Sequence, residues 1–137
     1  MSISPKIILD ASAIIAYLDD EPGSDIVEEW LPDSAASMVN ICEVISVLAR
    51  EGKPEEQVSE GVRDLIPTIV LFSWEIARAT AAMIKDTQPK GLGLGDRAAL
   101  ATVKVMNLPV LTAESRWLEV PTGADIRLIR QRHVPRC

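Results

Sequence analysis

Short apolar runs alternate along the chain with longer segments in which apolar residues recur at every third or fourth position. The short runs predict buried strands, and the longer segments predict amphipathic helices. The predicted strands cover residues 7–9, 35–39, 68–72, 109–112 and 126–129. Strands that alternate with helices are typical of an α/β fold, in which a mainly parallel sheet is flanked by helices on both faces. We therefore predict this fold class.

The predicted helices begin and end at residues that favour helix boundaries. They cover residues 12–18, 25–31, 40–51, 54–65, 74–85 and 96–106. Ser24 and Ser73 precede helices and can accept hydrogen bonds from first-turn amides. Gly52 and Asn107 follow helices and readily adopt the left-handed conformation of a helix end. The segment GLGLGD lacks the lysine of a phosphate-binding loop and the spacing of a dinucleotide fingerprint, so we interpret it as the lead into the last helix.

Composition predicts one soluble globular domain over residues 1–137. Apolar residues make up 47% and charged residues 25% of the chain, which is typical of a single folded domain. No apolar stretch approaches the roughly 20 residues of a membrane span, and no secretory signal is visible, so we expect a cytoplasmic protein. Cys42 and Cys137 lack metal-ligand spacing and are expected to be free thiols, and His133 is expected to be solvated.

Charge is distributed unevenly along the chain. The formal net charge of −6 argues against broad, non-specific binding of nucleic acid. The last predicted strand and the tail, about 126–137, nevertheless contain four arginines and no acid. This basic strip is a candidate for phosphate contacts, and a solvated charged terminus is the alternative.

Four acids lie where strands end or helices begin. Asp10 follows the first strand directly, and Glu114 follows the fourth strand by two residues. Glu43 and Asp96 lie in the first turns of two predicted helices, and Asp96 shares a face with apolar residues. In open parallel sheets, ligands bind at the edge where the carboxyl ends of the strands meet. The four carboxylates are therefore candidates for one site.

Each acid also has a purely structural explanation. Asp10 can cap the helix that follows it, and Asp96 can interact with the positive end of its helix dipole. Asn40 and Glu43 match a capping box, in which two side chains bond to first-turn amides. Glu114 can be an ordinary exposed loop residue. The residues taken one by one leave these alternatives open, whereas their shared edge favours a common site.

Carboxylates that lie close together repel one another, so their negative charge has to be offset. Two unit charges about 4 Å apart interact by roughly 4 kcal/mol at an effective dielectric constant near 20. Protonation, which raises the pKa of a carboxyl group, relieves this repulsion, and so does a divalent cation. Ligands that are all oxygen favour magnesium or manganese over zinc. The acids therefore predict a Mg²⁺ or Mn²⁺ site.

Four segments resemble the acidic motifs of PIN-domain nucleases. They are IILDASAIIAYL, NICEVISVL, GLGDRAALATV and PVLTAESRW, and their order and spacing match the family over essentially the whole chain. The similarity is greatest to the VapC toxins of bacterial toxin–antitoxin pairs, in which a PIN domain forms the entire protein. Each motif is weak alone, and the four together are specific.

The resemblance implies an endoribonuclease that hydrolyses RNA phosphodiester bonds with water activated by Mg²⁺ or Mn²⁺. It implies products with 5′-phosphate and 3′-hydroxyl ends. Asp10, Glu43 and Asp96 match the three core acids of the family. Glu114 stands where aspartate is most frequent, so its longer side chain leaves its role open.

The resemblance also implies auxiliary residues and partners. Ser12 and Thr112 offer hydroxyl groups next to Asp10 and Glu114, and these are candidates for binding metal-bound water or phosphate. Arg97 is a candidate for a contact with the substrate phosphate, and a plain surface residue is the alternative. Proteins of this type form homodimers and are silenced by a VapB antitoxin, so we expect both partners here.

Two other functions remain as alternatives. A PIN module that binds RNA or metal without cleavage would have the same fold. A phospho-acceptor receiver domain also places acids and magnesium at a sheet edge. It would show paired acids after the first strand, an acceptor aspartate after a central strand and a late lysine. Here ILDA has one acid, TIVLF ends without one, and no lysine follows PVLT.

Overall fold

Within residues 4–131, which the computed structural model describes, the strands form one sheet of five. The strand order is β3-β2-β1-β4-β5, and each neighbouring pair is parallel. The strands are β1 (Ile7–Leu9), β2 (Ser34–Ser37), β3 (Thr68–Val70), β4 (Val110–Thr112) and β5 (Ile126–Leu128). Because all the strands point the same way, their carboxyl ends lie along one edge of the sheet.

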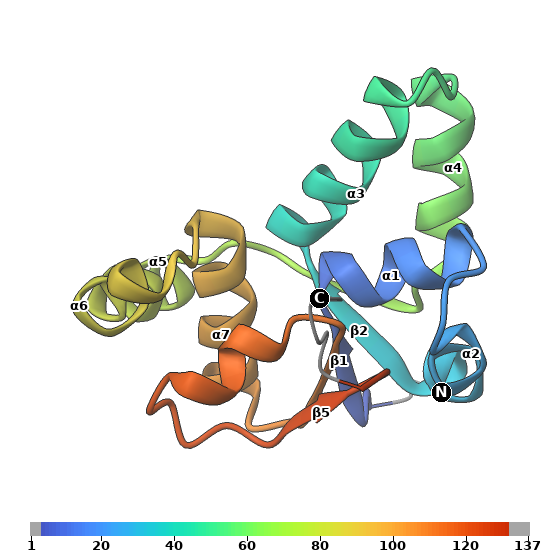
Figure 1. Cartoon of the computed structure of the whole chain (residues 1–137). Helices are drawn as coiled ribbons and strands as arrows, with labels where there is room; N and C mark the ends of the chain where they lie inside the picture. The colour runs from blue at the N-terminus through green and yellow to red at the C-terminus, as the bar shows by residue number, and fades with distance from the viewer. Residues whose placement is uncertain (1–3, 132–137) are drawn as a thin grey trace, which may run out of the picture.

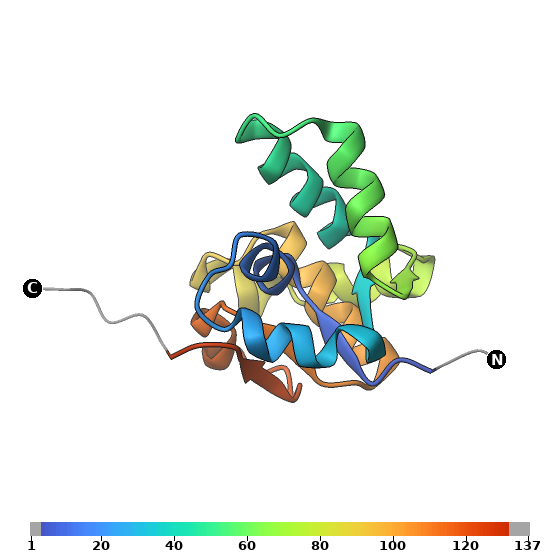
Figure 2. The ribbon, with the colours of Figure 1, turned by 90° about the vertical axis from the view of Figure 1, so that its right-hand side faces the viewer.

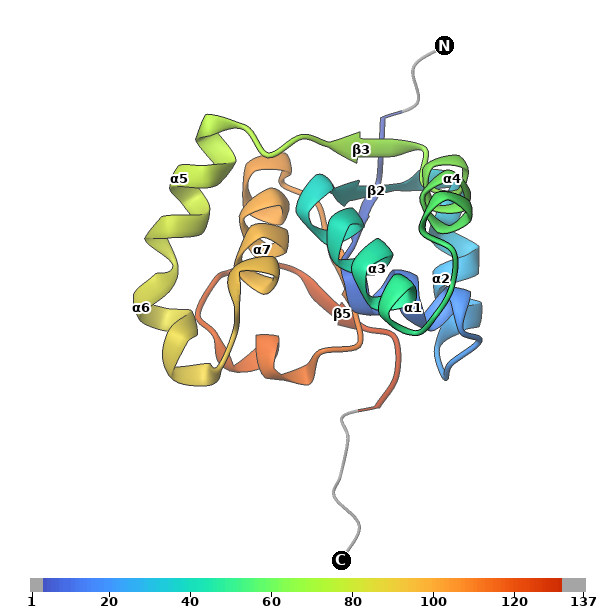
Figure 3. The same ribbon diagram turned by 90° about the horizontal axis from the view of Figure 1, so that it is seen from above.

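Helices cover both faces of this sheet. Figure 3 shows α1 to α4 on one side of the strands and α5 to α7 on the other. In Figures 1 and 2, α3 and α4 form an antiparallel pair that projects beyond the sheet. The α-helices are α1 (Ala11–Leu18), α2 (Ser24–Trp30), α3 (Met38–Arg50), α4 (Glu55–Leu65), α5 (Trp74–Ala82), α6 (Ile84–Thr87) and α7 (Leu94–Met106), and the 3₁₀ helices are η1 (Leu31–Asp33), η2 (Gln88–Lys90) and η3 (Ser115–Glu119). The predicted fold class is confirmed.

The central strand β1 is buried on both faces. Ile7 and Leu9 belong to the core between the sheet and α1 to α4, whereas Ile8 belongs to the opposite core with Leu100 of α7. All three β1 residues are fully buried. A strand with apolar neighbours on both sides is a continuous apolar run, because neither of its faces meets water. Asp10 follows this run directly and therefore lies at the carboxyl edge of the sheet.

The start of α3 differs from the prediction. The strand predicted over 35–39 ends at Ser37, and the helix begins at Met38 rather than at Asn40. Ser37 is the N-cap, because its hydroxyl accepts a hydrogen bond from the Val39 amide at 3.2 Å. The capping-box interpretation of Asn40 is therefore wrong, and Asn40 lies inside the first turn with its side chain free for another role.

The helix predicted over 74–85 is divided in the structure. α5 begins after Ser73, whose hydroxyl accepts from the Ile76 amide at 3.2 Å, so the predicted cap is confirmed. The helix ends at Ala82, and the separate α6 follows Met83.

The strand order argues against the receiver-domain alternative. A receiver sheet has the order 2-1-3-4-5, with its third strand inside the sheet. Here β3 is an edge strand, and Leu71 rather than an acid follows it. Among residues 4–131, no helix combines the length and apolar character needed to cross a membrane. The predictions for the end of the basic strip, for His133 and for Cys137 lie outside the described residues.

Candidate functional site

A cavity of about 200 Å³ lies at the carboxyl edge of the sheet. Its walls come from the residue that follows β1, from α1 and α3, from the first turn of α7 and from the segment that follows β4. Four acids that are far apart in the sequence meet there. The lining residues are Asp10, Ala11, Ser12, Ile15, Asn40, Glu43, Val47, Asp96, Glu114 and Trp117. The parallel sheet therefore brings the four predicted acids to one cavity.

Asp10 is the most buried of these acids. Its Oδ1 accepts from the Ala13 amide at 2.9 Å, so Asp10 caps α1. The structural explanation for Asp10 is therefore correct, and Asp10 lines the cavity as well. The Ser12 and Thr112 hydroxyls each donate to the carboxylate at 2.7 Å. Burial raises the pKa of Asp10 from 3.8 to about 6, despite these hydrogen bonds, and the nearby charge of Asp96 adds to the rise.

Ser12 and Thr112 link the ends of β1 and β4. Their hydroxyl oxygens lie 3.3 Å apart. The Ser12 oxygen accepts from the Ala113 amide, and the Thr112 oxygen accepts from the Glu114 amide, both at 2.9 Å. In this structure both hydroxyls hold Asp10 in place. Their predicted contact with metal-bound water or phosphate stays a prediction.

Glu43 lies against the first turn of α7. Its Oε1 accepts from the Asn40 side-chain amide at 2.7 Å, and the same amide nitrogen donates to the Gly95 carbonyl at 3.1 Å. Burial raises the pKa of Glu43, and the charge of Asp96 adds to this. A Cβ atom at Gly95 would overlap the Glu43 carboxylate. The sequence reasoning missed Asn40 and Gly95, although the spacing of three between Asn40 and Glu43 places both on one helix face.

Asp96 is held by a buried tryptophan. Its Oδ1 accepts from the Trp117 indole nitrogen at 3.2 Å, and its Oδ2 accepts from the Gly93 amide at 3.1 Å. Trp117 is fully buried. An indole N–H in a core needs an acceptor, and Asp96 supplies it. The prediction that Asp96 faces inward is confirmed. Its partner Trp117 entered the sequence reasoning only through the motif PVLTAESRW.

Glu114 is paired with an arginine at the rim of the cavity. Its two carboxylate oxygens accept from Arg116 Nε at 2.8 Å and Nη2 at 2.9 Å. Hydrogen bonding from this guanidinium lowers the pKa of Glu114. Arg116 also donates to the Gly91 carbonyl at 3.2 Å. Glu114 therefore differs from the other three acids because its charge is already neutralised, a feature that sequence reasoning missed.

Among the described residues, Arg97, Arg127 and Arg130 do not line this cavity. Arg97 is half-buried, and its Nε has no hydrogen-bond partner among the described residues. In the described part of the basic strip, Arg127 pairs with Asp125 at 3.0 Å, and Arg130 pairs with Glu21 at 3.2 Å. Their contact with a substrate stays a prediction.

The chemistry of the cavity suits a small hard cation. Asp10, Glu43 and Asp96 provide oxygen donors. Burial, and to a smaller extent the charge of Asp96, raises the pKa of the Asp10 and Glu43 carboxyl groups, and a bound cation would offset this charge penalty. Within residues 4–131, no three Asp, Glu, His or Cys side chains are already grouped as they would be around an ion. The donor set fits Mg²⁺ or Mn²⁺, which prefer ligands that are all oxygen.

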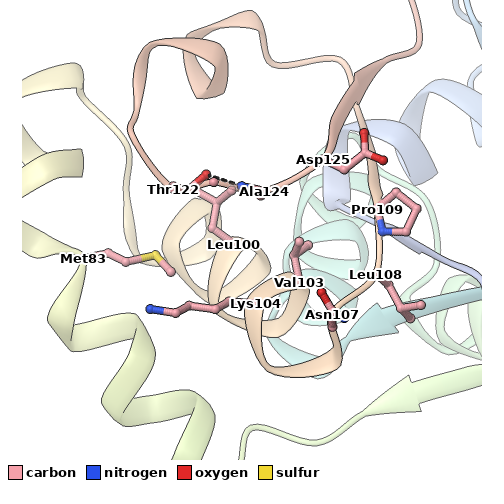
Figure 4. A pocket seen from close by; sticks show the side chains of 11 residues that line it. Met83, Leu100, Val103, Lys104, Asn107, Leu108, Pro109, Thr122, Ala124 and Asp125 are labelled. Atoms are coloured by element: carbon pink, nitrogen blue, oxygen red, sulfur yellow. Dashed lines mark hydrogen bonds between the residues drawn. The ribbon is translucent and has the colours of Figure 1, made fainter.

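A second cavity, of about 320 Å³, lies near the amino ends of β4 and β5 (Figure 4). It is bounded by the last turns of α7 and by the segment before β5, and the Thr122 hydroxyl accepts from the Ala124 amide at its wall. Asp125 and Lys104 are the charged residues of this lining. A single acid that is paired with Arg127 offers no comparable donor set, so the candidate site is the cavity at the carboxyl edge.

Known proteins are similar to this chain in sequence. The family model described as "PIN domain" matches residues 7–123. The chain is 29% identical over 114 residues to Ribonuclease VapC42 of Mycobacterium tuberculosis and to VapC ribonuclease Mb2780c of Mycobacterium bovis. Each match covers 76% of this chain and 87% of the relative.

Solved structures show the same fold. A toxin–antitoxin complex from Klebsiella pneumoniae matches with a TM-score of 0.71 and 20% identity, over 93% of this chain and 100% of that chain. A DNA-bound VapBC from Salmonella typhimurium matches with a TM-score of 0.70 and 18% identity, over 92% of this chain and 99% of that chain.

Proposed function

This chain belongs to the PIN-domain family, and from this premise we propose that it is a metal-dependent endoribonuclease, the toxin of a VapBC-type pair. One observation carries the proposal: Asp10, Glu43, Asp96 and Glu114 line one cavity although they are up to 104 positions apart. The relatives named as ribonucleases support RNA as the substrate.

The cavity residues have distinct tasks in this proposal. In it, Asp10, Glu43 and Asp96 would hold Mg²⁺ or Mn²⁺, and Glu114 would support the site from the rim, where it is paired with Arg116. When bound, the cation activates the attacking water, stabilises the leaving oxygen and offsets the phosphate charge. Ser12 and Thr112 orient the Asp10 carboxylate, and Trp117 orients Asp96. Without a cation these carboxylates repel a polyanionic substrate, so substrate and cation are expected to bind together.

The partners belong to the same proposal. The VapBC neighbours support a VapB-like antitoxin as the partner of this chain. A homodimer is supported by large apolar side chains at the surface around the start of α5: Trp74 is 81% exposed and Leu71 is 67% exposed. Light scattering on the purified chain, alone and with a co-expressed antitoxin, measures both assemblies.

Removal of the cation tests the proposed reaction. Purified protein is treated with EDTA and incubated with single-stranded and structured RNA, with or without added Mg²⁺ or Mn²⁺. We expect cleavage with added cation only, and products with 5′-phosphate ends. Tight RNA binding without cleavage in every condition would contradict the enzyme and favour the non-cleaving RNA-binding module.

Glu114→Gln is expected to reduce cleavage less than the loss of any other cavity acid. Arg116 already neutralises Glu114, so this carboxylate acts mainly as a support, and loss of such an outer partner costs about tenfold in activity. The measurement is kcat/KM at saturating Mn²⁺. Glu119→Gln is the matched control, because Glu119 is exposed at the end of η3, the 3₁₀ helix that Glu114 caps. A loss as large as that of Asp10→Asn would instead make Glu114 a direct ligand.

A further inference from the structure

The first turns of α3 and α7 meet at the Glu43 carboxylate. Asn40 approaches this carboxylate from α3, and Gly95 lies against it from α7. We propose that Asn40 and Gly95 are positioning residues that hold Glu43 in place for the cation. This inference rests on the proposed function, because it concerns the same cavity.

The orientation of the Asn40 amide follows from its partners. Its side-chain nitrogen lies 2.7 Å from Glu43 Oε1 and 3.1 Å from the Gly95 carbonyl oxygen. A carboxylate and a carbonyl only accept hydrogen bonds, so the NH₂ group and not the oxygen of Asn40 must face them. Both amide hydrogens are thereby used. A single side chain therefore connects Glu43 of α3 to the backbone of α7 beside Asp96.

The other end of the Asn40 side chain is unsatisfied. Asn40 is 1% exposed, and its Oδ1 has no hydrogen-bond partner among the described residues. A buried acceptor without a partner costs stability, and a leucine of similar size would avoid this cost. An asparagine is useful here for its donor, which is directed at Glu43. This pattern is expected of a side chain that serves the cavity rather than the core.

Gly95 provides the space in which Glu43 lies. A Cβ atom at this position would overlap the Glu43 carboxylate, so any other residue has to displace it. Glycine is unfavourable inside a helix, and alanine would strengthen α7. By contrast, a Cβ atom at the helical Gly61 of α4 would meet no atom within 4 Å. The first turn of α7 therefore needs a glycine where Glu43 packs on the helix backbone.

Two variants test the positioning role by different routes. Asn40→Leu removes the donor together with the unsatisfied oxygen, and Gly95→Ala adds an atom where the carboxylate lies. Each has a matched control. Thr102→Val removes a buried hydroxyl that donates within α7, and Gly61→Ala is the same change in an open helix position. The measurements are the Kd for Mn²⁺ by calorimetry on metal-stripped protein and the urea midpoint in EDTA.

We expect Asn40→Leu and Gly95→Ala each to weaken Mn²⁺ binding about tenfold, the effect of removing support from a ligand. The urea midpoints should stay near or above that of the parent protein, and both controls should bind Mn²⁺ normally. In a Glu43→Gln background, neither variant should weaken Mn²⁺ binding further, because both act through Glu43.

Three results would overturn the inference. In the first, folded Gly95→Ala binds Mn²⁺ as tightly as the parent protein does. In the second, Asn40→Leu or Gly95→Ala weakens Mn²⁺ binding as much in the Glu43→Gln background as in the parent protein. In the third, the parent protein does not bind Mn²⁺. The last result would also remove the proposed function. If the two variants weakened Mn²⁺ binding through Glu43 but the parent protein did not cleave RNA, the inference would be upheld and only the ribonuclease would be contradicted.

Discussion

Asp10→Asn is expected to lower the rate of RNA cleavage by more than about a hundredfold, since loss of a residue that only supports a metal ligand costs up to that factor. Asp10 lies at the centre of the carboxyl edge, where Ser12, Thr112 and the Ala13 amide fix its two oxygens. An amide in its place keeps the shape and removes the negative charge that holds the cation. The measurement is single-turnover cleavage of RNA at saturating Mn²⁺.

Asp25→Asn is the matched control for this variant. Asp25 lies exposed in the first turn of α2, so the same change there removes a charge at a helix start away from the cavity. Its cleavage rate should equal that of the parent protein. If folded Asp10→Asn kept cleavage within a few-fold of the parent, the cavity would not be the reaction site.

The sequence predicted the parts of this fold that depend on local pattern. The apolar run from Ile7 to Leu9 becomes a strand buried on both faces, and the Ala-rich segment before Asn107 becomes α7. Asp10 and Glu114 were expected at one edge because both follow strands of a parallel sheet. The cavity shared by the four acids follows from that topology.

Contacts that depend on strand register and on short turns could not be predicted from the sequence. Thr112 reaches Asp10 because β1 pairs with β4, with Leu9 opposite Leu111, a register that local pattern does not specify. The Glu114–Arg116 pair depends on the 3₁₀ turn that follows β4, which was not predicted. In the same way, the helix start at Met38 places Asn40 inside the first turn.

Asp10 also predicts how stability depends on pH in the metal-free protein. Its pKa is raised from 3.8 to about 6 by burial, so the folded state binds this proton more tightly than the unfolded state does. The stabilisation is therefore complete below pH 4 and is lost as pH rises through about 6. The loss amounts to about 3 kcal/mol, at 1.36 kcal/mol per pKa unit.

The pH effect is measured as the difference in unfolding free energy between Asp10→Asn and the parent protein. Urea unfolding in EDTA at several values between pH 4 and pH 8 should show this difference shift in favour of Asp10→Asn by most of this amount, because asparagine carries no charge at any of these values. Other groups titrate in both proteins and largely cancel. Added Mn²⁺ should restore stability to the parent protein at pH 7, since the cation binds the deprotonated carboxylate. Parallel pH curves for the two proteins would mean that burial imposes no charge penalty on Asp10, and the electrostatic reason for a cation in this cavity would be lost.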